Sequence, residues 1–144
     1  MILTAQDLLR KGETVRGLKV LELAKEDKRA APYALSILAV EHLRTGQPES
    51  AILELQESIR LLPGQAANHS NLALALAWKG RSEQGLIEAR KALQLDPSRP
   101  KTRYVLGQIL LDMGRTEEAE FHLKAAAQEL AGARELLVKY FHGQ

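Results

Sequence analysis

The stretch that decides the fold runs from Ala66 to Arg99 and reads AANHSNLALALAWKGRSEQGLIEARKALQLDPSR. Its apolar residues fall three or four positions apart in two runs, which is the spacing of one face of an amphipathic helix. The first run comprises Leu72, Ala73 and Leu76, and the second comprises Gly85, Leu86, Ala89 and Leu93. A turn signal at Lys79-Gly80-Arg81 separates the runs, and Asp96-Pro97 ends the second one. The stretch therefore predicts two helices joined by a tight turn.

The same unit recurs along the chain with a period of 34 residues. The glycines that share this spacing are Gly12, Gly46, Gly80 and Gly114. At an average glycine usage of about 7%, three further matches by chance have a probability of roughly a few in ten thousand. A second column, of small residues only, is Gly17, Ala51, Gly85 and Ala119. The first column predicts turns in which glycine takes a positive φ, and the second predicts close helix crossings.

These columns resemble the tetratricopeptide repeat, whose 34-residue pattern places Leu-Gly, Tyr, Ala, Phe and Pro at fixed positions. In the central unit the matching residues are Leu72-Ala73, Leu76, Gly85, Ala89 and Pro97, with equivalents in the units before and after it. The large aromatic residues of the family pattern are replaced here by Leu and Ala. The resemblance implies an all-α fold, a right-handed α-solenoid of antiparallel helix pairs. Sel1-type helical repeats are a weaker match, because their period is slightly longer.

We expect a single domain over residues 1–144, because about three repeats are needed to bury a continuous core. It divides into a partial repeat at about 1–31, repeats at 32–65, 66–99 and 100–133, and a C-terminal capping helix at 134–142. The chain is expected to loosen at Ala131-Gly132-Ala133 before this helix. The helix is expected to dock through Leu137, Tyr140 and Phe141. The alternative is that these side chains pair with a second molecule.

Composition narrows the classes of function. Lys and Arg number 20 against 18 Asp and Glu, a net charge of +2, and the two signs are interspersed. This pattern is typical of a solvated helical surface and not of a nucleic-acid-binding stripe. The absence of Cys excludes disulfides and thiolate metal sites. Apolar runs reach the length of neither a signal peptide nor a membrane span, so the predicted location is the cytoplasm.

Motifs that carry chemistry are missing from the sequence. It has no Gly-x-Ser-x-Gly, no phosphate-binding loop and no Cys nucleophile. The four histidines fall at unrelated repeat positions without an i, i+4 pair. The basic cluster Arg99, Lys101 and Arg103 is interpreted as a solvated junction. We therefore predict no catalytic residue, no cofactor and no metal site.

The candidate site is the side of the first helix of each pair that faces away from its apolar stripe. Side by side, these faces are expected to line one concave strip, where the resemblance implies that peptides bind. The predicted partner-binding residues are Tyr33, Ser36, Val40, Arg44, Ser70, Asn71, Leu74, Trp78, Lys101, Tyr104, Gln108 and Leu111. Trp78, beside the turn, is the residue most expected to lie at an interface.

The predicted function is that of a non-catalytic protein–protein interaction module, an adaptor or scaffold, with a protein or peptide as partner. Some family members hold the C-terminal carboxylate of a chaperone at five positions. Asn71 and Lys101 match that clamp, whereas Ser36, Val40 and Val105 do not. Self-association as a homodimer is the alternative. A nucleic-acid-binding helical repeat would need a pair of code-like polar residues in each unit, which is absent, and neither nucleic acid nor membrane insertion is expected.

Overall fold

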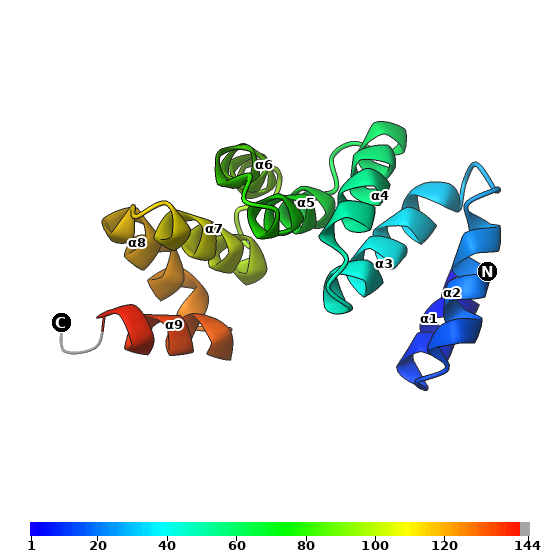
Figure 1. Ribbon diagram of the computed structural model, residues 1–144, viewed down its shortest axis with the longest axis horizontal. Helices are drawn as coiled ribbons and strands as arrows, with labels where there is room; N and C mark the ends of the chain where they lie inside the picture. The colour runs from blue at the N-terminus through cyan, green and yellow to red at the C-terminus, as the bar shows by residue number, and fades with distance from the viewer. Residues whose placement is uncertain (142–144) are drawn as a thin grey trace. The chain divides into compact units, whose positions relative to one another are not determined.

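The computed structural model describes residues 1–141, which form nine α-helices and no strand (Figure 1). The helices are α1 (Ile2–Arg10), α2 (Thr14–Ala24), α3 (Ala31–Arg44), α4 (Pro48–Leu61), α5 (Ala66–Trp78), α6 (Ser82–Leu95), α7 (Pro100–Asp112), α8 (Thr116–Ala127) and α9 (Ala131–Phe141). The first eight pack as four successive antiparallel pairs, so the predicted all-α array of helix pairs is confirmed.

The turn within each pair has the glycine that the 34-residue period predicted. Gly80 has φ 76°, and the equivalent glycines of the other three pairs have φ between 74° and 79°. In the central pair the Arg81 N–H donates to the Leu76 carbonyl at 2.9 Å, and the Gly80 N–H donates to the Ala77 carbonyl at 3.0 Å. This is the Schellman arrangement, which satisfies the last carbonyls of a helix and needs a left-handed residue at its centre.

The small-residue column lies where the two helices of a pair cross. A Cβ atom on Gly85 would lie 2.8 Å from the carbonyl oxygen of Ala73, which is backbone and cannot move aside. Gly107, which lies outside this column, is also tightly packed, and a Cβ atom there would lie 2.5 Å from the Leu123 side chain. A Cβ atom at either glycine would therefore force a neighbour to shift, and the reason is packing and not φ.

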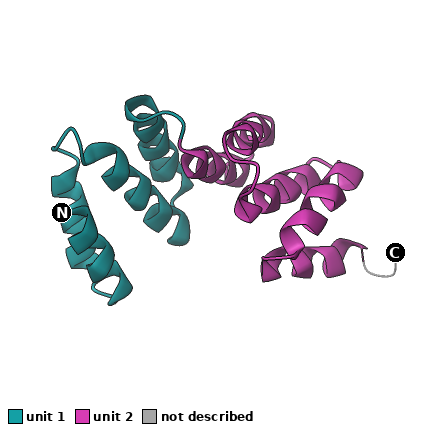
Figure 2. Ribbon diagram, turned by 180° about the vertical axis from the view of Figure 1, so that it is seen from behind, with its two compact units in different colours: residues 1–64 teal, residues 65–144 magenta. Residues whose placement is uncertain are grey.

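The chain forms two compact units, residues 1–64 and the remainder from residue 65 (Figure 2). Unit 1 contains α1 to α4, and its buried cluster comprises Ala5, Leu21, Ala24, Ala34 and Leu38. Unit 2 contains α5 to α9 and has one cluster between α5, α6, α7 and α8, and another under α9. The single domain over residues 1–144 and the handedness of a superhelix stay predictions.

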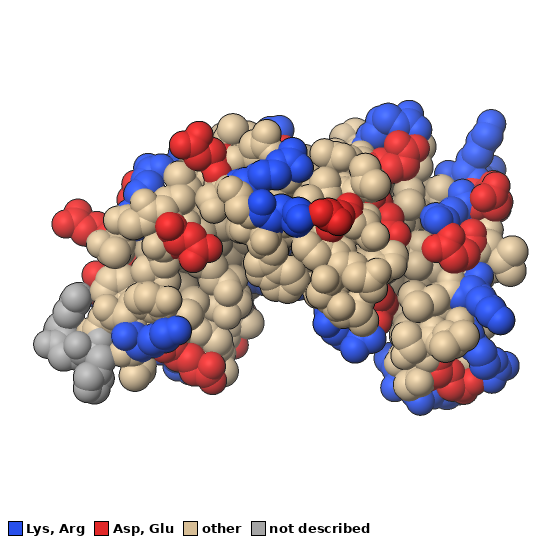
Figure 3. All heavy atoms as spheres, in the orientation of Figure 1, with Lys and Arg blue, Asp and Glu red and all other residues tan. Residues whose placement is uncertain are grey.

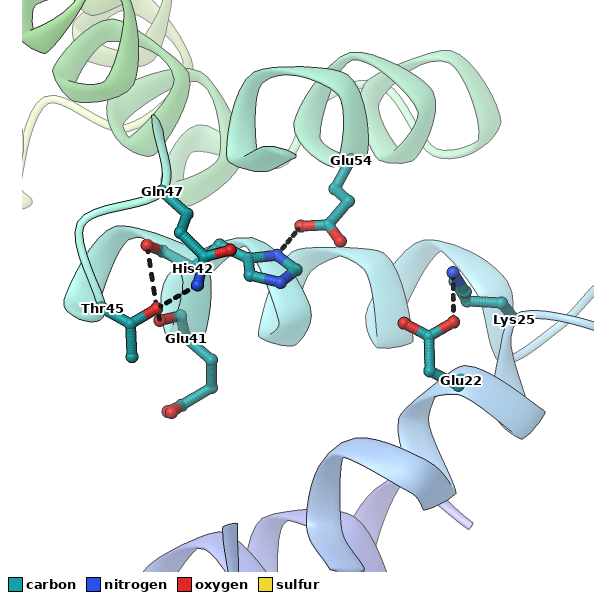
Figure 4. A network of polar contacts seen from close by, with 7 residues as sticks. All are labelled: Glu22, Lys25, Glu41, His42, Thr45, Gln47 and Glu54. Atoms are coloured by element: carbon teal, nitrogen blue, oxygen red, sulfur yellow. Dashed lines mark hydrogen bonds and ion pairs between the residues drawn. The ribbon is translucent and has the colours of Figure 1, made fainter. Parts of the chain in front are cut away.

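A polar bridge ties α3 to α4 in unit 1 (Figure 4). His42 Nδ1 lies 2.7 Å from Glu54 Oε2, and both side chains are largely buried. Burial raises the pKa of the Glu54 carboxyl, and the hydrogen bond to His42 opposes this rise. Beside it, Thr45 Oγ1 donates to the Glu41 carbonyl at 2.9 Å and accepts from Gln47 Nε2 at 3.0 Å. The contacts of Thr45 thus connect the end of α3 to the turn that precedes α4.

Helix α9 begins at Ala131, three residues before its predicted start, so the expected break at residues 131–133 is wrong. The three small residues form its first turn because they allow a close approach. Ala133 is fully buried beside Leu123 and Ala126. A Cβ atom on Gly132 would lie 3.0 Å from the Tyr104 hydroxyl oxygen. The predicted last residue of this helix, His142, lies outside the described residues.

Candidate functional site

Unit 2 contains a pocket of about 160 Å³ between three of its helices. Helix α5 contributes Leu74, Ala77 and Trp78. Helix α7 contributes Gln108, Ile109, Leu111 and Asp112, and helix α9 contributes Leu136 and Tyr140. The structure thus brings together four residues that the sequence placed in the candidate site, namely Leu74, Trp78, Gln108 and Leu111.

Helical spacing and core packing place these side chains. Leu74 and Trp78 are one turn apart on α5, as are Gln108 and Asp112 on α7, so each pair shares a helix face. Ile109 is fully buried in the core between α5, α6, α7 and α8, and it forms the floor of the pocket. Because Ile109 belongs to the core, α5 and α7 hold their side of the pocket in a fixed geometry.

The rim of the pocket combines two aromatic rings with two polar groups. Trp78 is 53% exposed and Tyr140 is 51% exposed. The Asp112 carboxylate and the Gln108 amide form no ion pair or hydrogen bond with the residues that the structure describes. The Nζ atom of Lys139 lies 5.2 Å from the centroid of the Tyr140 ring. The rim therefore offers aromatic surface and unused hydrogen-bond acceptors.

The predicted site residues of unit 1 all lie on α3. Tyr33 is 52% exposed and Val40 is 40% exposed. Ser36 Oγ is 2.9 Å from the Pro32 carbonyl and 2.9 Å from Ser58 Oγ, so its hydroxyl is engaged within the unit. Arg44 pairs with Glu41 through Nε at 3.0 Å and through a terminal nitrogen at 2.7 Å. Of these four residues, Tyr33 and Val40 are the two whose side chains are exposed and make no polar contact with the described residues of the unit.

Two of the predicted site residues are buried. Ser70 has no exposed surface and Asn71 has 7%. Every residue of α5 from Asn68 to Ala73 is buried, so no side of this half of the helix faces solvent. The placement of Ser70 and Asn71 on an open face is therefore wrong. It assumed that polar residues mark the exposed side, and here packing covers them.

Lys101 and Tyr104 lie outside the pocket. Lys101 is an exposed residue near the start of α7. Tyr104 is partly buried against the first turn of α9, where it packs beside Ala133 and Leu123. Its structural role is thus to seat α9.

Asp112 was not predicted from the sequence, and Tyr140 was predicted in a different contact. Asp112 lies 34 residues after Trp78, so the repeat period itself pointed to it. Of the three residues expected to dock α9, Leu137 and Phe141 pack against the buried cluster together with Leu136, whereas Tyr140 does not. No pattern in the sequence shows which side of α9 faces α5.

The surface charges and the histidines do not suggest a second site. Basic and acidic side chains alternate over the face drawn in Figure 3. Among the described residues no group of three or more His, Asp and Glu side chains is placed to hold a metal ion. In the same part of the chain, no helix is long and apolar enough to cross a membrane.

Residues 88–139, which are 52 of the 144 residues, match the sequence model of the tetratricopeptide repeat. A structure of MamA from AMB-1 superimposes with a TM-score of 0.74 at 23% identity, covering 88% of this chain and 75% of that one. The chain has the tetratricopeptide repeat fold. The tetratricopeptide repeat domain of Arabidopsis OM64 has a TM-score of 0.72 at 18% identity and covers 78% of this chain and 95% of that one.

The first tetratricopeptide repeat domain of Spaghetti (RPAP3) has a TM-score of 0.69 at 17% identity, covering 75% of this chain and 88% of that one. That domain is bound to the HSP90 peptide SRMEEVD. No curated protein matches the chain. At these identities the likeness concerns the tetratricopeptide repeat fold and does not extend to the residues of a binding site.

Proposed function

We propose that this chain is a non-catalytic interaction module that binds a peptide segment of another protein at the pocket between α5, α7 and α9 of unit 2. The observation that carries the proposal is the pocket between α5, α7 and α9, with Trp78 and Tyr140 half exposed at its rim. Half-exposed aromatic rings at a preformed hollow are typical anchors of protein recognition. Of the residues predicted to line the concave strip, we propose that four contact the peptide, namely Leu74, Trp78, Gln108 and Leu111.

A displayed library of random peptides, selected on the immobilised protein, tests the proposal. Selected peptides are then titrated by fluorescence anisotropy against the parent chain and against Trp78→Ala. We expect Trp78→Ala to weaken binding about tenfold or more, since truncation of a central aromatic anchor costs about 2 kcal/mol or more. Ile87→Ala is the matched control, because Ile87 is 56% exposed in the same unit but does not line the pocket.

Equal weakening by the two variants, or none by Trp78→Ala, would contradict the proposed site. The peptide SRMEEVD provides a separate comparison. The five-position clamp for chaperone C-termini that the family resemblance implies is incomplete here at Ser36, Val40 and Val105, and Val105 is 1% exposed. We therefore expect SRMEEVD to bind no better than a scrambled peptide.

Self-association is the second candidate function, and helix α2 is the observation that favours it. Val15 and Leu23 are 70% and 67% exposed, and with Leu18, Lys19 and Glu22 they line an open hollow of about 550 Å³. The residues at the position of Val15 in the three later pairs are Glu49, Glu83 and Glu117. Sedimentation equilibrium of the parent chain and of Val15→Glu tests this candidate. A dimer that dissociates in the variant supports it, and a monomeric parent chain excludes it.

A further inference from the structure

Among the described residues, the two polar side chains that line the pocket of unit 2, Asp112 and Gln108, have no partner, and both offer acceptor oxygens. Asp112 is an exposed carboxylate that forms no ion pair with any described residue, whereas Glu88 and Glu118 in the same unit are both paired. Gln108, one turn earlier on α7, likewise leaves its side-chain amide uncommitted. A carboxylate accepts hydrogen bonds only, so this rim is matched to a donor that carries positive charge.

The position of Asp112 is unfavourable for the helix that carries it. It is the last residue of α7, where the helix dipole presents its negative end and disfavours another negative charge. The equivalent residues of the two preceding pairs are Arg44 and Trp78, so the repeat does not require an acid here. The carboxylate therefore contributes nothing to folding that the structure shows, and it faces the pocket.

Aromatic rings provide the second half of the same match. Trp78 and Tyr140 both line the pocket and are both about half exposed. Faces of Trp and Tyr rings attract cations through their quadrupole. The Tyr140 ring already has such a contact, because the Lys139 Nζ atom lies 5.2 Å from its centroid. Lys139 is thus a positive group beside the Tyr140 ring, and it competes with an incoming cation.

We propose that the pocket binds the guanidinium group of an arginine side chain in the bound peptide. A planar, weakly hydrated guanidinium stacks on aromatic faces and offers five donors to a carboxylate and an amide oxygen, which the compact and strongly hydrated lysine ammonium does less well. The volume of about 160 Å³ is smaller than the roughly 300 Å³ at which pockets for whole small molecules begin, and it suits a single side chain. This inference rests on the proposed function, because the arginine belongs to the peptide.

A titration with N-acetyl-arginine methylamide, followed by NMR, tests the pocket directly. The chain has a single Trp, so the indole N–H signal belongs to Trp78 and reports on the rim. The citrulline analogue keeps the shape and removes the charge, and the glutamate analogue reverses the charge. We expect the arginine compound to bind about three- to tenfold more tightly than the citrulline compound, and the glutamate compound not to bind.

Three variants test whether the rim causes this preference. Asp112→Asn is expected to remove most of the arginine-over-citrulline preference, and it should fold because it relieves the end of α7. Glu117→Gln removes one negative charge from an exposed position of the same unit outside the pocket and is expected to change nothing. Lys139→Ala removes the competing cation and is expected to tighten binding of the arginine compound.

Equal binding of the arginine and citrulline compounds, or preference for glutamate, would overturn the inference. So would equal effects of Asp112→Asn and Glu117→Gln. The peptide selection separates this failure from that of the proposed function. Peptides that depend on Trp78 but share no arginine leave the proposed function standing and refute the arginine pocket. The absence of any peptide that depends on Trp78 refutes the proposed function itself.

Discussion

His122 occupies the position in α8 that Glu88 occupies in α6, 34 residues earlier. Glu88 pairs with His69 of α5, and the distance from His69 Nδ1 to Glu88 Oε2 is 2.7 Å. His122 faces Arg103 of α7, with Nδ1 3.3 Å from a guanidinium nitrogen. Burial, and then the charge of Arg103, lowers the pKa of His122 below its usual value, with Arg90 acting in the same direction and Glu118 against it. Equivalent positions in the two helix pairs thus differ. Glu88 attracts a protonated His69, whereas a protonated His122 is repelled by Arg103.

His122→Glu should raise the free energy of unfolding relative to His122→Gln. The glutamate places a carboxylate opposite Arg103, and a half-buried pair of this kind contributes up to about 1 kcal/mol. Urea denaturation of both variants at pH 7 measures the difference, and repeating it in about 1 M salt should reduce it. A glutamate variant no more stable than the glutamine variant would show that Arg103 turns to solvent.

Acidification should destabilise the parent chain more than His122→Gln. A His whose folded pKa lies below its unfolded value of 6.5 stabilises the fold above that pH, and this contribution is lost as the pH falls through it. Thermal denaturation of both proteins at pH 7.5 and 5.5 gives the comparison. Equal losses in the two proteins would assign the acid sensitivity to other groups. Glu88 is not one of them, because its pKa is lowered and it loses its contribution only below pH 4.5.

The close crossing of α5 and α6 sets the position of the wall of the pocket that α5 forms. A Cβ atom at Gly85 would lie 2.8 Å from the Ala73 carbonyl oxygen, whereas one at Gly64 would have no atom within 4 Å. Gly64 has φ 94°, a conformation that the sequence did not reveal and that is strained for other residues. The two glycines therefore resist substitution for different reasons.

Gly85→Leu should destabilise the protein more than Gly64→Leu. At Gly85 the helices must separate, and overpacking of a core typically costs about 1–3 kcal/mol, and more where backbone blocks the way. At Gly64 the cost is limited to a left-handed backbone, about 1–2 kcal/mol. Chemical denaturation midpoints of the two variants decide between these, and equal midpoints would remove the argument that the crossing is tight.

Helix α9 covers the last apolar face of unit 2. Leu136, Leu137 and Phe141 pack on the cluster of Leu123, Ala126 and Ala133. Tyr140 stays half exposed at the pocket and is not part of that cluster. The helix thus serves both as the end of the stack and as one wall of the pocket.

Removing residues 131–144 should lower the melting temperature markedly, because it exposes the face that α9 covers. If these residues instead formed a contact between two molecules, the truncated chain would lose a dimer on a sizing column and keep its melting temperature. Circular dichroism and size-exclusion chromatography of both chains distinguish the outcomes. A truncation that changes neither would show that α9 does not stabilise unit 2.

Across the whole chain, the 34-residue period predicted the helix pairs, their glycine turns and four of the residues that line the pocket. The period failed where packing departs from repetition. Polar Ser70 and Asn71 lie on a segment buried on every side, which their chemistry does not reveal. Tyr140 reaches the pocket only because α9 docks by its small first turn, and that docking has no counterpart earlier in the chain. Local patterns thus predict elements, and contacts particular to one place decide the site.

The position of the single Trp has an optical consequence. Trp78 belongs to unit 2, and residues 1–64 of unit 1 contain no Trp. Tryptophan fluorescence, excited selectively at the red edge of the absorption band where Tyr does not absorb, therefore reports on unit 2 alone. Far-ultraviolet dichroism, by contrast, sums the helices of both units. Overlaid denaturation curves from the two signals would coincide if the units melt as one cooperative body. If unit 1 unfolded first, the dichroism signal would fall before the Trp emission changed. Comparing the two curves would therefore measure the coupling between the units without any label.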